Sequence, residues 1–146
     1  MKLENIEENV FPQDEIITLR FRITNSEIVE GQKKRAVMLF FEGTTDTKWF
    51  QGRTLPGSID TQIQQDGEPG RLSARYMLEG IDSEGQSCRI FIENNGTDIN
   101  GDIQTTPMIL TDSKVLAWLE TAELTGRLDF AGEEMIIRIF STGRRR

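Results

Sequence analysis

The chain has 146 residues, a net charge of −7, one cysteine and no histidine. This length suits a single domain with a hydrophobic core, and an apolar content of 36% beside 28% charged residues is typical of a folded chain. The lack of histidine excludes a Ser-His-Asp triad and a Cys-His dyad, and the single cysteine excludes a thiolate zinc site.

The composition also limits partners and compartment. The negative charge argues against nucleic acid, whose phosphates it would repel, and no apolar run approaches the roughly 20 residues that span a bilayer. No glycine-rich nucleotide motif occurs, so we expect neither a cofactor nor a metal. The acidic N-terminal stretch lacks a secretory signal and the lone Cys88 suits a reducing compartment, so we expect one cytoplasmic domain over residues 1–146. The basic clusters 33–35 and 144–146 are interpreted as a solvated turn and a solvated tail.

The first half of the chain reads as strands. Residues 15–24 alternate apolar and polar side chains, which predicts a strand with one buried face. Residues 35–43 are apolar on both faces and predict a well-covered strand, and residues 25–34 form the connection before it. Two shorter strands follow, at 47–54 and 57–65.

In the second half the pattern changes once. Residues 71–81 and 86–94 alternate as strands, and the polar segment 94–107, with two Asn-Gly pairs, is expected to be an irregular loop. Residues 112–123 carry apolar side chains at helical spacing behind an Asp or Ser N-cap, so a helix is predicted there. A hairpin over 125–141 ends the chain.

This succession of alternating segments and tight turns predicts an all-β fold. We expect a single antiparallel up-and-down β-barrel of about eight strands with one short helix near residues 112–123. A barrel of eight strands encloses either packed side chains or one small ligand. A two-sheet sandwich is the alternative, because alternation alone does not separate the two architectures.

Several short motifs carry a family resemblance. They are Phe41-x-Gly43, Gly52-Arg53-x-Leu55-Pro56-Gly57-x-x-Asp60-x-Gln62, Ala74-Arg75-Tyr76-x-Leu78, Asn95-Gly96, Thr105-Thr106-Pro107 and Trp118-Leu119. Together they resemble the uncharacterised bacterial family called domain of unknown function 3237, or uncharacterised protein family 0311. The resemblance implies a small antiparallel β-barrel and lends no catalytic residue. The chain departs from the pattern at Ser58, where many members have glycine, and at Thr61, where many have an aromatic residue.

The candidate site begins with Asp60 and Gln62, which share one face of their strand. They face either solvent or an enclosed polar cavity. Arg75 and Glu93 lie on the next two strands, so the charged side chains of all three strands could converge on one wall of the barrel. We therefore predict that Asp60 and Arg75 face each other across adjacent strands inside the barrel, because an inward charge needs a partner.

Three further residues complete the candidate ligand site. Tyr76 is either a core ring or an acid in the site, Asn95 is either a turn former or a polar contact, and Trp118 either covers a barrel end or packs as an ordinary core residue.

Three functions fit these features. The first is a barrel that binds a small molecule. The second is a cofactor-free isomerase, cyclase or lyase that uses a carboxylate base on a small carbonyl compound. The third is an acidic module that docks a partner protein. Homo-oligomer formation stays open.

Overall fold

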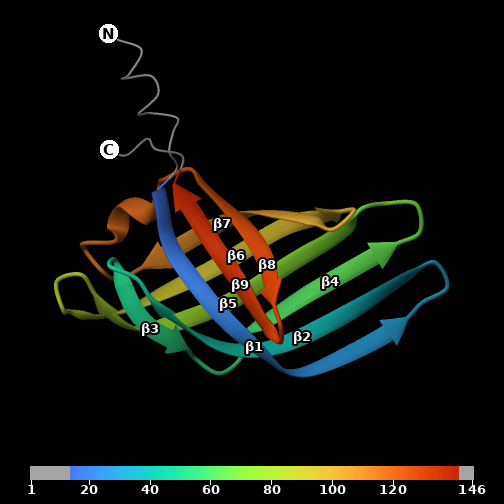
Figure 1. Ribbon diagram of the computed structural model, residues 1–146, viewed down its shortest axis with the longest axis horizontal. Coiled ribbons are helices and arrows are strands. Elements are labelled where there is room, and N and C mark those ends of the chain that lie inside the picture. The colour runs from blue at the N-terminus through green and yellow to red at the C-terminus, as the bar shows by residue number, and fades with distance from the viewer. Residues whose placement is uncertain (1–13, 142–146) are drawn as a thin grey trace, which may run out of the picture.

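Nine antiparallel strands form one sheet that closes into a barrel in the computed structural model, which describes residues 14–141 (Figure 1). The barrel closes because β1 pairs with β2 on one side and with β9 on the other. The expected antiparallel barrel is therefore confirmed, and the two-sheet sandwich is wrong. The strands are β1 (Asp14–Glu30), β2 (Lys34–Asp46), β3 (Phe50–Thr54), β4 (Ile59–Gln65), β5 (Gly70–Asp82), β6 (Ser87–Ile99), β7 (Asp102–Thr111), β8 (Leu124–Ala131) and β9 (Glu134–Ser141).

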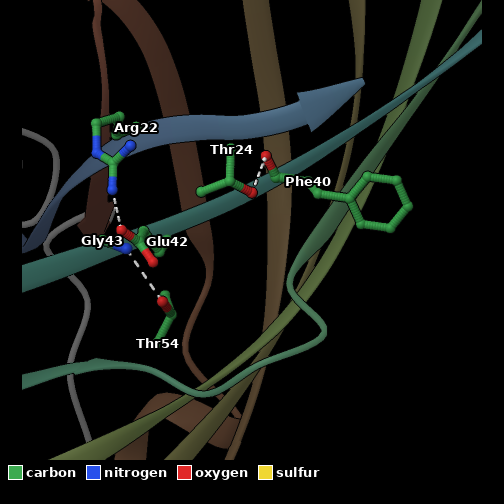
Figure 2. Close-up of polar contacts among 6 residues, drawn as sticks. All are labelled: Arg22, Thr24, Phe40, Glu42, Gly43 and Thr54. Carbon is green, nitrogen blue, oxygen red and sulfur yellow. Dashed lines mark hydrogen bonds and ion pairs between the residues drawn. The ribbon is translucent and has the colours of Figure 1, made fainter. Parts of the chain in front are cut away.

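Strands β3 and β4 share one position in the wall. Both lie between β2 and β5, with β3 beside the last residues of β2 and β4 beside the first. The segment Leu55–Ser58 interrupts them, and side chains and loop backbone replace part of the missing ladder. Figure 2 shows the Thr54 hydroxyl accepting the Gly43 N–H at 3.0 Å, next to the Arg22–Glu42 ion pair of the outer face. The Ser58 carbonyl accepts the Phe41 N–H at 3.3 Å.

A bulge in β1 divides the barrel into a packed half and an open half. The register of β1 against β2 shifts between Ile23 and Asn25, and the Thr24 hydroxyl donates to the Phe40 carbonyl at 3.2 Å beside this shift (Figure 2). Residues 16–21 of β1 include the buried core side chains, whereas residues 22–30 are exposed. One end of the barrel is therefore a close-packed core, and the other is open to solvent.

The predicted helix over 112–123 is wrong in extent, because only Ala117–Glu120 form a single 3-10 turn, η1. The segment lies at the packed end of the barrel (Figure 1). Its side chains Leu116 and Leu119 are fully buried. Polar side chains hold it there: the Ser113 hydroxyl donates to Asp82 at 2.7 Å and accepts the Leu116 N–H at 3.2 Å. These tertiary contacts, and not helical propensity, fix its path.

The predicted loop over 94–107 is also wrong, because β6 and β7 form a continuous hairpin there. Only one of the two Asn-Gly pairs makes the turn, since Asn100 and Gly101 both have positive φ angles, 55° and 89°. The other glycine, Gly96, lies within β6, where a Cβ atom would lie 2.2 Å from the Gln104 carbonyl oxygen. Gly96 therefore permits a close approach of the two strands.

Two further features of the described part of the chain concern membrane-spanning helices and clusters of metal-ligating side chains. Within residues 14–141, no helix is long and apolar enough to cross a membrane, and no group of three or more metal-ligating side chains gathers. The basic tail 144–146 lies outside the described residues.

Candidate functional site

The central feature of the barrel interior is a buried carboxyl group. Asp60 on β4 is 6% exposed, between Leu39 of β2 and Ala74 of β5. Burial raises the pKa of Asp60 above its ordinary value, because the charged form loses hydration. The Gln62 amide donates to Asp60 Oδ2 at 2.9 Å, and this hydrogen bond opposes part of the pKa rise.

Two neighbouring strands place a phenol and an amide beside this carboxyl group. Tyr76 on β5 is 3% exposed, and its ring packs edge-on against Phe21 and Phe41. Burial raises the pKa of Tyr76, the charge of Asp60 raises it further, and Asn94 on β6 lowers it. The interaction of Tyr76 with both Asp60 and Asn94 shows that the three polar groups form one cluster.

Four polar atoms of this region are buried without a hydrogen-bond partner in the described part of the chain: Asp60 Oδ1, Tyr76 Oη, Asn94 Oδ1 and Thr105 Oγ1. Thr105 joins the cluster from β7. A Cβ atom built on Gly126 of β8 would lie 2.3 Å from Thr105 Oγ1 and 3.7 Å from Asn94 Nδ2, so both groups lie beside this glycine. Buried polar groups in native proteins nearly always have partners, so this cluster is unusual.

A cavity of about 240 Å³ opens beside the cluster at the open end of the barrel. Its walls include Leu72, Ile103 and Phe130, and Gln62 lines it too. Because the Gln62 amide also binds Asp60, this side chain stands between the cavity and the buried carboxyl group. The cavity thus combines apolar walls with polar and charged side chains, including Arg35, Gln64 and Asp98.

The strands that carry Asp60, Tyr76 and Asn94 fall within a region that is similar to a known protein family. The family model described as "Protein of unknown function (DUF3237)" matches residues 14–104. The chain belongs to the DUF3237 family. The matched region covers Asp60, Tyr76 and Asn94 and ends one residue before Thr105.

One curated relative supports this membership. A UPF0311 protein of Clostridium acetobutylicum is 31% identical over 100 residues, which are 66% of this chain and 59% of the relative. The match therefore spans less than two thirds of the relative's own length.

Solved structures share the DUF3237 barrel. A protein of unknown function from Clostridium acetobutylicum superposes with a TM-score of 0.76 at 20% identity, covering 90% of this chain and 99% of the other. A beta-barrel-like protein from Acinetobacter baumannii gives 0.72 at 16% identity, covering 89% and 94%. A structure described as an enzyme from Penicillium herquei gives 0.62 at 15% identity, covering 88% and 95%. At these identities the similarity shows a common fold.

The expected pairing of Asp60 with Arg75 is wrong for this DUF3237 chain. Arg75 lies opposite Ile59, one residue from the expected register, so its side chain points to the outer face of the barrel. There it is 55% exposed and bonds Glu93 at 3.2 Å between Nε and Oε2. Arg75 and Glu93 are thus together, but on the opposite side of the wall from Asp60.

The remaining predicted residues are divided between the interior, the outer face and the packed end. Gln62 and Tyr76 lie with Asp60 in the interior. Asn95 is on the outer face, where it accepts a hydrogen bond from Ser73 at 2.6 Å. Trp118 lies on η1 at the packed end, with its ring 5.8 Å from that of Trp49.

The sequence interpretation missed Asn94 and Thr105, because both lie in the segment 94–107 that was expected to be an irregular loop. A signal for Asn94 was present. Cys88, Ile90 and Ile92 alternate along the inner face of β6, and continuing this period by one step places Asn94 inside as well. Thr105 had no such signal, because the loop assignment hid the strand in which it lies.

The exposure of Arg75 sets the expected result of replacing it. Arg75→Met should lower the free energy of unfolding by no more than about 1 kcal/mol, because its ion pair with Glu93 is largely solvated. In a double-mutant cycle with Asp60→Asn, the coupling measured by urea unfolding should be near zero. A loss of about 3–5 kcal/mol, typical of a broken buried ion pair, would contradict the outward orientation.

Proposed function

We propose that this protein binds a small organic molecule inside the barrel, at the cluster of Asp60, Tyr76, Asn94 and Thr105. The observation that supports this most is the set of four buried polar atoms without partners. Leaving a buried donor or acceptor unsatisfied costs about 1–3 kcal/mol for each group. A ligand that bonds several of these atoms together would recover much of that cost.

The shape of the interior supports the same proposal. Ala74, whose side chain is a single methyl group, lies between Asp60 and Asn94 on three neighbouring strands. The cavity at the open end has the apolar side chains of Leu72, Ile103 and Phe130 in its wall, and the Gln62 amide links it to Asp60. A ligand with an apolar body and a polar end would place the body against the walls and the polar end on the cluster.

Two adjacent asparagines provide a matched test. Asn94 is buried in the interior and Asn95 is exposed on the outer face of the same strand. We expect fragments that bind the wild-type protein, detected by ligand-observed NMR, to bind Asn95→Leu equally and to lose at least about tenfold in affinity with Asn94→Leu, as one lost hydrogen bond of about 1.4 kcal/mol predicts. Urea unfolding of Asn94→Leu and Asn95→Leu checks that both variants are folded under the conditions of the binding measurement. Equal binding to both variants would contradict the proposed site.

A second candidate function is cofactor-free catalysis in the same site. It is favoured by the proximity of the Asp60 carboxyl group to the Tyr76 hydroxyl, and by a structure of the same fold described as an enzyme. Asp60 would remove a proton from a small carbonyl compound, and the Tyr76 hydroxyl would donate a hydrogen bond to the resulting enolate oxygen. This chemistry fits an isomerase, cyclase or lyase. Asp60→Asn should then abolish turnover at saturating substrate, and an unchanged rate would exclude this role.

A further inference from the structure

The charge inside the barrel restricts the chemical class of the ligand more closely than the shape of the cavity does. Among residues 14–141, no Lys or Arg side chain is buried, and Asp60 is the one acidic side chain that is buried in the polar cluster. Arg35 and Arg71 line the mouth of the cavity, but both are exposed to solvent. Asp60 therefore has no cationic partner in the described part of the protein, and the hydrogen bond that it accepts from Gln62 comes from a neutral amide.

The unsatisfied atoms also have a common chemical character. Asn94 Oδ1 accepts hydrogen bonds and does not donate, and so does Asp60 Oδ1 when the carboxyl group is ionised. The hydroxyls of Tyr76 and Thr105 accept as well as donate. A ligand that satisfies this set must bring hydrogen-bond donors, and a donor group with a positive charge would also neutralise Asp60.

We infer that the interior site selects a protonated amine, with the ammonium group on Asp60 Oδ1 and on the oxygens of Asn94 and Tyr76. This rests on the proposed function and names the ligand class for the same site. An ammonium group offers three donors to these three oxygens, and hydrogen bonds to charged groups are about twice as strong as neutral ones. A carboxylate ligand would instead place a second negative charge beside Asp60. A neutral alcohol would offer one donor and leave the carboxylate without a cation.

Three probes of one shape separate these cases. Phenethylamine, phenethyl alcohol and phenylacetate share a benzene ring and differ in the charge of the terminal group. Each is titrated at neutral pH by ligand-observed NMR, together with the corresponding naphthyl series in case the larger ring fills the cavity better. We expect the amine to bind at least about tenfold more tightly than the alcohol, as a charged hydrogen bond of about 1.5–3 kcal/mol predicts, and the carboxylate to bind weakest.

Two carboxylates supply matched variants: Asp60 in the interior cluster and Asp98 at the mouth of the cavity. Asp60→Asn should remove the preference for the amine, so that the amine and the alcohol bind this variant with similar affinity. Asp98→Asn changes a carboxylate that lines the mouth, and it should keep the preference, because the inference assigns the ammonium to the interior. A preference for the amine over the alcohol that persists in Asp60→Asn would overturn the inference. A preference that disappears in Asp98→Asn would overturn it too.

The outcomes also separate this inference from the proposed function. Probes that bind without charge preference and are weakened by Asn94→Leu would overturn the amine assignment and leave the binding site in place. Binding that is unaffected by Asn94→Leu would contradict the site itself. If no amine of the phenyl or the naphthyl series binds, the inference is overturned.

Discussion

Asp60→Asn is expected to raise the free energy of unfolding of the ligand-free protein at neutral pH, by about 0.5–2 kcal/mol. The reason is that burial raises the pKa of Asp60, so the folded state resists ionisation of a group that ionises freely in the unfolded chain. Asparagine keeps the shape and an acceptor for the Gln62 amide, without the charge. The wild-type carboxyl group of Asp60 would thus lower the stability of the ligand-free protein.

The sign of the pH dependence follows from the same shift. Below the ordinary aspartate pKa near 4 the carboxyl group is protonated in both states, so Asp60 does not disfavour folding. As the pH rises toward the elevated folded pKa, the unfolded chain releases its proton first, and stability falls. The advantage of Asp60→Asn should therefore be small at acidic pH, grow as the pH rises, and level off above the folded pKa.

Urea unfolding of both proteins across this pH range measures the effect, and Asp66→Asn in the exposed turn between β4 and β5 is the control. The control should not reproduce the pH-dependent gain. A loss of stability in Asp60→Asn at neutral pH, or a difference from wild type that is constant with pH, would contradict the account of Asp60 as a buried carboxyl group without a cation.

Leu119→Ala is expected to lower the free energy of unfolding by about 2–5 kcal/mol. Leu119 is 1% exposed on η1, where this single turn closes the packed end of the barrel. Removing its side chain leaves a cavity at the boundary between η1 and the core, because the backbone of this turn is fixed by its own i→i+3 hydrogen bonds and does not close over the gap.

Leu110→Ala provides a matched control, because Leu110 is 49% exposed on the outer face of β7. Its loss should stay within about 0.5 kcal/mol, as for most surface substitutions. If the free energy of unfolding of both variants depends equally on urea concentration, the two losses of stability can be compared directly. The difference between them measures how much closure of this end contributes to stability. Equal losses would mean that η1 does not seal the core.

The sequence by itself determined every strand except β7. Alternation of apolar and polar residues is a local property, and it marked seven of the eight positions in the wall well enough to predict a closed antiparallel barrel. The alternation along β5 also indicated the correct, outward orientation of Arg75, because its neighbours Ala74 and Tyr76 belong to the apolar face of this strand. The expected inward Arg75 went against that pattern because an inward Asp60 seemed to require a cation.

Other features depended on the tertiary structure. On β4 the isoleucines alternate with Asp60 and Gln62, and burial of apolar residues alone would turn the isoleucines inward. Closure of the barrel instead sets the register of β4 against β2 and β5, which places Asp60 inside. The same closure converted the expected loop 94–107 into paired strands, and so brought Asn94 and Thr105 to the site. Register and closure depend on contacts between distant segments, and one residue of shift reverses which face every side chain occupies.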